Sequence, residues 1–408
     1  MTKFLRFIKI KNMKNIKFIP FLALIAIFCS NCETSNVRKS LTKKITQATV
    51  NDSTFRQEIP FEMMDNIPVI DVNIEGKTYK FILATGSLGC FISEELMQKL
   101  PKTALTEMKS KNRKGENQRY TYAQIPKIEI GNTTFYDVLS GVTDVSKNYK
   151  CIKIDGVLGA NLLSKAVWQI DYPNKKIKFA NHRDSLFLGK NKQIIPFYSK
   201  SFAGIGVPLA SLRVNYNFIG DVVFDTGDKN AVYFPMTIHK SISDTSQNVL
   251  FINKRDTNKL ALLHNLTIGE QFHLKDVWID KSNKSIARIG GVFFRNYVVT
   301  FDWKNRQIIL SEDQKQIFET FGCYYSWTDT AGVRIGVIVK NSEADKAGLK
   351  PGEHIVKFNE HDVSEISQEN FCSITKPNSS KVLRLSIKRG DEILNFTFDK
   401  VPGKTLVE

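Results

Sequence analysis

A short motif occurs twice in this chain of 408 residues, and only the second copy carries a carboxylate. The second copy is Asp225-Thr226-Gly227, and the first is Ala84-Thr85-Gly86. An apolar run precedes each copy, at residues 222–224 and 81–83. Two carboxylates held about 3 Å apart share one proton, so that one acts as a base on water while the other polarises a carbonyl group. The pattern indicates this chemistry, but Ala84 leaves Asp225 without its partner.

The residues that follow Ala84 and Asp225 in the two motifs can also be explained physically. Gly86 and Gly227 let the backbone turn tightly and approach a carboxylate closely. Thr85 and Thr226 offer hydroxyl groups that can donate and accept hydrogen bonds across to the opposite loop. We therefore expect the two loops to face each other and to be locked together.

The fourth position differs between the copies, with Ser87 in the first and Asp228 in the second. Asp228 belongs to the same loop as Asp225, so we do not expect it to replace the missing carboxylate. Loss of one member of a catalytic unit lowers rates by roughly 10⁴-fold or more. We expect Ala84→Asp to recreate a proton-sharing pair if the groove is otherwise intact. Whether Ala84 is natural or engineered stays open.

The repetition extends well beyond the two loops. Each copy has a proline-led alternating segment before the loop, a segment ending in Ile-Gly after it, and a glycine 12 residues before an aspartate. The matching segments are 68–74 with 208–214, 128–131 with 266–269, and 159–172 with 290–303. Ordered matches at similar spacing indicate an internal repeat, which decides architecture before local propensity does. Two similar lobes are predicted.

The repeated features resemble the retropepsin-like aspartic peptidase family, in the fused two-lobe form found in bacteria. Asp225-Thr226-Gly227 matches the family's Asp-Thr-Gly-Ser/Ala motif, and residues 156–163 match its second signature, a glycine followed by a short helix. The resemblance covers roughly residues 60–312. It implies a mainly β fold, with two β-barrel lobes forming a pseudo-dimer around a groove for peptides or proteins. It also implies catalytic positions at Asp225 and Ala84.

The C-terminal part has a different pattern, in which residues 342–359 resemble a bacterial PDZ domain. A short helix at 344–347 ends at Gly348, and a strand at 353–358 follows the turn Pro351-Gly352. The resemblance implies an α+β domain in which a helix at 368–375 and a strand at 324–327 hold a peptide. It also implies a carboxylate-binding loop at Thr320-Phe321-Gly322-Cys323, with Thr320 in place of the usual first glycine. A PDZ fold that only packs against the lobes is the alternative.

The amino terminus is predicted to be an export signal over residues 1–32. Six Lys or Arg residues through Lys17 precede an apolar run at 18–28, and this run of about 11 residues is too short to span a bilayer. Cys29 and Cys32 close the run and resemble the lipidation site of a bacterial lipoprotein. A plain signal peptide with incidental cysteines is the alternative. We expect a protein of the cell envelope, periplasmic or held to the membrane by lipid.

Charge and cysteine content exclude some classes of function. Removing the six signal cations lowers the formal net charge from +17 to +11, and no arginine-rich run remains, which predicts a solvated basic surface and no nucleic-acid partner. The histidines lack metal-ligand spacing and no phosphate-binding glycine loop is present, so we expect no metal and no cofactor. The four later cysteines are free thiols or two disulfides, and a bond between Cys323 and Cys372 would narrow the PDZ groove.

The predicted order along the chain is a linker at 33–54, a first lobe at 55–182, a second lobe at 183–312 and a PDZ domain at 318–403. Within the first lobe we expect a short helix at 93–100 and a hairpin or loop at 109–118. The leading prediction is an aspartic-peptidase-family protein that acts on peptides or proteins, with weak or absent peptidase activity. The alternative is a non-catalytic adaptor that binds peptides through the protease groove and through the PDZ domain, including protein C-termini.

Overall fold

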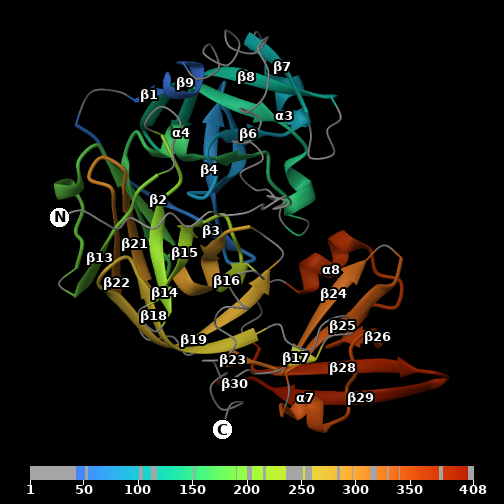
Figure 1. Cartoon of the computed structure of the whole chain (residues 1–408). Coiled ribbons are helices and arrows are strands. Elements are labelled where there is room, and N and C mark those ends of the chain that lie inside the picture. The colour runs from blue at the N-terminus through green and yellow to red at the C-terminus, as the bar shows by residue number, and fades with distance from the viewer. Residues whose placement is uncertain are drawn as a thin grey trace, which may run out of the picture.

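The structure is a computed structural model that describes residues 43–402 with short gaps. The gaps are residues 51–53, 101–103, 112–116, 150, 152, 190, 200–204, 215–216, 236–250, 253–259, 283–284, 296, 313–318, 329, 340 and 376–379. The chain forms two β-barrels, a sheet to which both halves contribute, and a separate C-terminal sheet (Figure 1). The prediction of a mainly β fold is confirmed.

The first barrel consists of six strands whose pairings close into a ring. In ring order they are β4 (Ile67–Ile74), β5 (Lys77–Leu83), β10 (Gly156–Leu158), β6 (Cys90–Ile92), β9 (Thr133–Val142) and β8 (Asn117–Ile130). Three further strands, β1 (Thr49–Val50), β3 (Glu62–Met64) and β7 (Ala104–Lys111), pair with β9, β4 and β8. Because successive side chains of a strand face opposite sides, alternate positions of β4 and β5 reach the main core, as Val72 and Phe81 do.

The second barrel repeats the first strand for strand. In ring order it comprises β14 (Leu209–Val214), β15 (Asn217–Phe224), β20 (Ala287–Ile289), β16 (Val232–Pro235), β19 (Phe272–Ser282) and β18 (Leu260–Ile268). The two parallel contacts of the first barrel, β5 with β10 and β6 with β9, recur as β15 with β20 and β16 with β19. The sequence repeat is therefore a repeat of topology.

A six-stranded sheet joins the two halves. Its order is β2 (Arg56–Pro60), β12 (Lys176–Ala180), β11 (Val167–Asp171), β21 (Tyr297–Asp302), β22 (Gln307–Glu312) and β13 (Lys192–Pro196). The first three strands come from the first half of the repeat and the last three from the second, and they meet where β11 pairs antiparallel with β21. We call this the shared sheet. It ties the barrels together through main-chain hydrogen bonds.

Short helices stand at equivalent places in the two halves. They are α4 (Ala160–Leu163) and α6 (Gly291–Phe294), each just after the strand that flanks a motif loop. The helix expected at 93–100 is α3 (Glu94–Lys99), and Ser93 caps it by accepting a hydrogen bond from the N–H of Leu96 at 3.0 Å. Two 3₁₀ turns are η1 (Val145–Asn148) and η2 (Arg183–Ser185). The hairpin expected at 109–118 is formed by β7 and β8, with residues 112–116 outside the described part.

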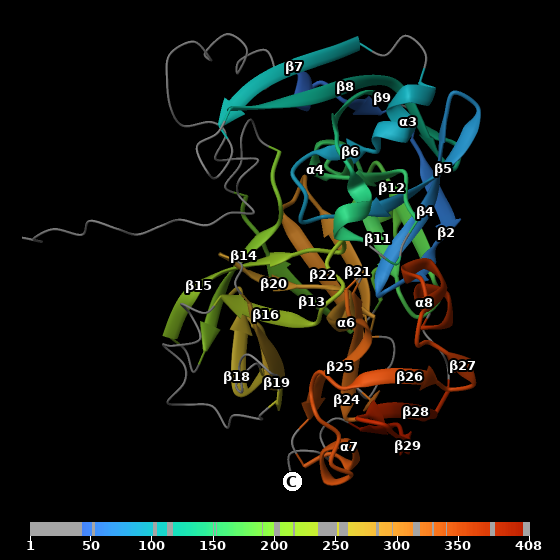
Figure 2. The ribbon, with the colours of Figure 1, turned by 90° about the vertical axis from the view of Figure 1, so that its right-hand side faces the viewer.

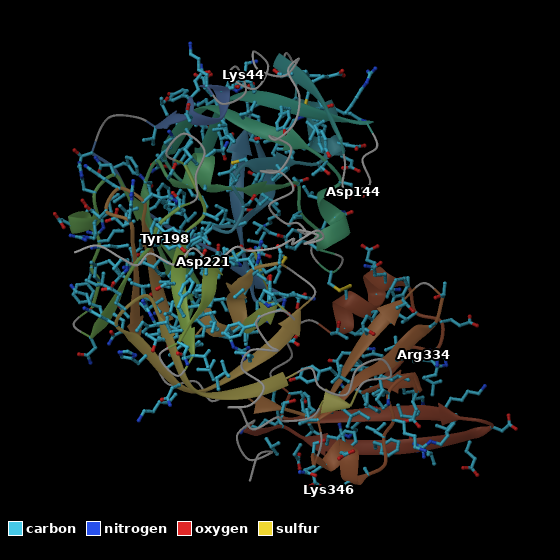
Figure 3. The ribbon with its side chains drawn as sticks, viewed as in Figure 1. Lys44, Asp144, Tyr198, Asp221, Arg334 and Lys346 are labelled. Atoms are coloured by element: carbon cyan, nitrogen blue, oxygen red, sulfur yellow. A yellow bond between two sulfur atoms is a disulfide. The ribbon has the colours of Figure 1, made fainter. Side chains whose placement is uncertain are left out.

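The linker predicted over residues 33–54 does not extend through its last part. Ala48 is buried, β1 pairs with β9, and Lys44 Nζ donates to Thr106 Oγ1 at 2.8 Å; Figure 3 labels Lys44. The reason is that Ala48 and Val50 supply apolar side chains in an otherwise polar stretch, and the first barrel covers them. The structure does not describe residues 1–42, which hold the predicted signal and both lipidation candidates, Cys29 and Cys32.

Residues 319–402 form the C-terminal domain, which has a core of its own. Its strands are β23 (Glu319–Thr320), β24 (Cys323–Thr328), β25 (Gly332–Val339), β26 (His354–Phe358), β27 (His361–Asp362), β28 (Val382–Arg389), β29 (Glu392–Asp399) and β30 (Val401–Pro402). Its helices are α7 (Glu343–Lys346) and α8 (Gln368–Ile374), close to the predicted ranges. A further strand from the second half of the repeat, β17 (Phe251–Ile252), pairs with β25, a contact that the sequence did not predict.

A disulfide joins the C-terminal domain to the first half of the chain. It links Cys151, three residues after η1, to Cys372 on α8, while Cys90 and Cys323 are free and buried. In Figures 1 and 2, α8 is the part of the C-terminal domain nearest the first barrel. Figure 3 places Asp144, which caps η1, on the same side. The bond between Cys323 and Cys372 considered from the sequence is therefore wrong: Cys372 bonds to the neighbouring domain.

Candidate functional site

The two motif loops lie against each other and are locked by reciprocal hydrogen bonds. The N–H of Thr85 donates to Thr226 Oγ1 at 3.1 Å, and the N–H of Thr226 donates to Thr85 Oγ1 at 3.1 Å. Each hydroxyl in turn donates to a carbonyl of the opposite strand end, Thr85 to Phe224 at 2.7 Å and Thr226 to Leu83 at 2.5 Å. The backbone N–H and hydroxyl groups of both threonines are buried, so these bonds satisfy polar groups that water cannot reach.

Asp225 is held on both of its oxygens. Oδ1 accepts hydrogen bonds from the N–H of Gly86 at 3.1 Å and the N–H of Gly227 at 2.9 Å. Oδ2 accepts from Arg288 Nη1, and the two groups form a buried ion pair. A β-carbon added at Gly86 would lie 2.2 Å from Asp225 Cγ, which explains the glycine at that place. The carboxylate thus sits in a fixed, enclosed position.

Ala84 occupies the matching place on the first loop, in an apolar cluster. A β-carbon built on Gly227 would lie 2.6 Å from the Ala84 methyl carbon, so the two loops are in contact here. The buried members of the cluster are Ile67, Val69, Ile82, Ala84, Val145, Ile154 and Val157. Tyr149 packs against them, and its hydroxyl donates to the carbonyl of Gly227 at 3.2 Å. Ala84 is only 3% exposed, so this side of the site is covered by apolar groups.

Burial keeps two tyrosines beside the loops and the two free thiols in their neutral forms. Burial, followed by the charges of Asp225 and Asp228, raises the pKa of Tyr149 above its ordinary value. Burial also raises the pKa of Tyr233. Neither phenol therefore ionises in the ordinary pH range. The free thiols are equally inert, because burial raises the pKa of Cys90 and that of Cys323 to about 12.

The fourth residues of the motifs serve their own loops. Ser87 Oγ donates to the carbonyl of Gly89 at 2.8 Å. Asp228 Oδ1 accepts from the backbone N–H of Asn230 at 3.0 Å and from its side chain at 2.7 Å, and Oδ2 accepts from Tyr233 Oη at 3.0 Å. Asp228 is therefore engaged within the second barrel.

Arg288 is the important side chain that sequence reasoning missed. It lies on β20, directly across from Val223 of the strand that leads into the Asp225 loop. Burial acts to lower the pKa of Arg288, but the negative charges of Asp225 and Asp228 outweigh it and raise the pKa, so the guanidinium stays charged. The sequence did contain a signal. At the equivalent place the first half has Val157, so the two halves differ by a cation against an apolar residue on the strand beside the Asp225 loop.

The predicted carboxylate-binding loop forms the turn between β23 and β24. Gly322 has φ +77°, a left-handed conformation that favours glycine, and its N–H donates to Thr320 Oγ1 at 3.1 Å. Phe321 lies between them, and Cys323 begins β24. β24 pairs with β25, and within the described residues no strand pairs with its other edge. Helix α8 lies beside β24, where the rings of Phe371 and Tyr325 are 6.1 Å apart.

Among the residues that the structure describes, no group of three His, Cys, Asp or Glu side chains lies close enough together to hold a metal ion. No helix in the same part of the chain combines the length and apolar character needed to cross a membrane.

Residues 70–162 match a family model described as Aspartyl protease. The likeness is limited to this segment of the chain. It runs from β4 through the Ala84 loop to α4, so it covers most of the first barrel. The match supports a relationship to aspartyl proteases over this segment. No curated protein matches the chain.

Proposed function

We propose that the chain is a two-lobe, retropepsin-like protein with a C-terminal PDZ domain, and that it binds extended peptide segments without hydrolysing them. The repeated barrels with their shared sheet support the two-lobe form. The order of β24, β25, α7, β26, β27, α8 and β28 supports the PDZ assignment. The protease-family segment makes peptides or proteins the ligand class.

One observation supports the non-hydrolytic part: where the loops meet, Asp225 has Ala84 opposite it and no second carboxylate, and Asp228 is bonded to Asn230 and Tyr233. Peptide hydrolysis at such loops needs one group that accepts a proton from water and a second that donates one to the carbonyl. Asp225 cannot fill both roles at once. Tyr149 and the apolar cluster around Ala84 also cover this side of the loops.

The peptide-binding part rests on the edge of β24 beside α8. The edge of a strand can accept an extended peptide as an additional strand. Capture of a C-terminal carboxylate needs free N–H groups in the preceding loop, but the N–H of Gly322 is already bonded to Thr320 Oγ1. Internal extended segments are therefore the favoured ligands of this groove, and C-termini are disfavoured.

Hydrogen exchange tests this proposal directly. The probe is a pool of acetylated and amidated decapeptides, compared with the same pool carrying free C-terminal carboxylates. We expect the blocked pool to slow amide exchange over Cys323–Thr328, with the free-carboxylate pool no more effective, because the new strand covers the edge of β24. Protection only around Ala84 and Asp225, or none anywhere, would contradict the PDZ part.

The same peptide pools separate the adaptor from the enzyme. They are incubated with the protein between pH 3 and pH 8 and inspected by mass spectrometry for cleavage products. We expect none. Cleavage that disappears in Asp225→Ala would favour the other reading, an aspartic-type endopeptidase with rearranged chemistry.

We also propose that the protein is exported to the cell envelope, on the strength of the cationic and apolar segments over residues 1–28. Lipid attachment at Cys29 or Cys32 would tether it to the membrane. Mass spectrometry of the mature amino terminus checks this, with a lipid-modified cysteine at residue 29 or 32 expected. A mature chain that still begins at Met1 or Met13 would contradict export.

A further inference from the structure

The two barrels place equivalent side chains around the interlocked loops, and the two sets differ in chemistry. Val157 and Arg288 stand at the same position, each on a strand that runs parallel to the one leading into its own loop. Phe91 and Tyr233 also correspond, because Phe91 pairs with Val157 and Tyr233 pairs with Arg288 on the neighbouring strand. The first set is Ala84, Ser87, Phe91 and Val157, and the second is Asp225, Asp228, Tyr233 and Arg288.

Within each set, the side chains that touch one another have matching chemistry. In the first barrel Ala84, Phe91 and Val157 belong to one apolar cluster. In the second barrel Arg288 pairs with Asp225, and Tyr233 donates to Asp228. The first barrel therefore surrounds its loop with apolar side chains, whereas the second pairs its carboxylate with a cation.

The burial of the pair makes the cation necessary. The side chains of Arg288 and Asp225 are 4% and 8% exposed. An isolated charge at such a place is strongly unfavourable unless an opposite charge and hydrogen bonds compensate it. In an intact dyad the second carboxyl group and a shared proton would supply this compensation.

We propose that Arg288 takes the place of the missing first carboxylate as the electrostatic partner of Asp225, which makes Asp225 a structural ion-pair residue. This inference does not depend on peptide binding by the C-terminal domain. It also replaces the expectation that Ala84→Asp restores hydrolysis. A carboxylate introduced at position 84 would enter an apolar cluster, while both oxygens of Asp225 are already engaged, Oδ1 by two backbone N–H groups and Oδ2 by Arg288.

A double-mutant cycle on the full chain tests the pair. The variants are Arg288→Met, Asp225→Asn and the two together, followed by thermal unfolding. Arg288→Met leaves a buried carboxylate without its counter-ion, and we expect the midpoint to fall by roughly 10 °C. Adding Asp225→Asn removes the stranded charge, so the double variant should recover at least half of this loss. Lys229→Met is the matched control, because it removes an exposed pair with Asp65 next to the same loop.

Several outcomes would overturn the proposal. One is a midpoint of Arg288→Met no lower than that of Lys229→Met, and another is a double variant that loses the sum of the two single effects. If Arg288→Met is insoluble, Asp225→Asn in the same chain should restore soluble protein, and failure to do so counts against the pair. Peptide cleavage by Ala84→Asp with Arg288 intact would equally overturn it, whereas its absence between pH 3 and pH 8 is expected.

Discussion

Gly86→Ala is expected to destabilise the protein severely. The added β-carbon would lie 2.2 Å from Asp225 Cγ and 2.3 Å from its Oδ2. The carboxylate has no room to retreat, since Gly227 and Arg288 hold it from other sides. Overpacking of a rigid site costs about 1–3 kcal/mol and sometimes more, and here the interlocking of both loops is lost as well. Chemical denaturation followed by circular dichroism measures the loss.

Gly89→Ala is the matched control for this change. It lies three residues further along the same segment, and the nearest atom to its added β-carbon is Ile45 Cδ1 at 4.0 Å. We expect the free energy of unfolding of this control to stay within about 0.5 kcal/mol of the parent value. Equal stabilities of Gly86→Ala and Gly89→Ala would show that the loops are not in contact as described.

Removal of the disulfide is the second large effect that we expect. Cys151 and Cys372 are 221 residues apart, and the chain-entropy argument gives about 5 kcal/mol for closing a loop of that length. The variant Cys151→Ser with Cys372→Ser should therefore unfold at a lower denaturant concentration. Its C-terminal domain, which has its own core, should melt in a separate transition.

Reductant provides the control for this second prediction. It should lower the unfolding midpoint of the parent protein and leave the double serine variant unchanged. Peptide mapping without reduction should recover Cys151 joined to Cys372. A parent midpoint that does not respond to reductant, or a map joining Cys372 to Cys323, would refute the assignment.

The sequence predicted what local chemistry and repetition determine. The helix after Ser93 is marked by its cap, and the repeated strands are marked twice by the same alternation, so both could be placed without coordinates. The interlocking of Thr85 and Thr226 was expected because the two copies of the loop imply an axis between them.

What the sequence could not predict depends on packing between distant segments. The role of Arg288 as a partner of Asp225 can be recognised only once β20 is known to lie beside the Asp225 loop. The position of Tyr149 against Gly227 depends on how a turn of one barrel meets a loop of the other. The pairing of Cys372 depends on where the C-terminal domain sits, which no local pattern records.

The shared sheet has a consequence for how the chain is made. One edge of β11 pairs with β12 at once, but the partner of its other edge, β21, follows more than a hundred residues later, after all six strands of the second barrel. At ordinary rates of translation this leaves the edge of β11 open for roughly 10 s. An open strand edge invites pairing with other chains, so a holdase that shields nascent strands would suit this protein. The shared sheet is complete only when the nascent chain has passed Glu312.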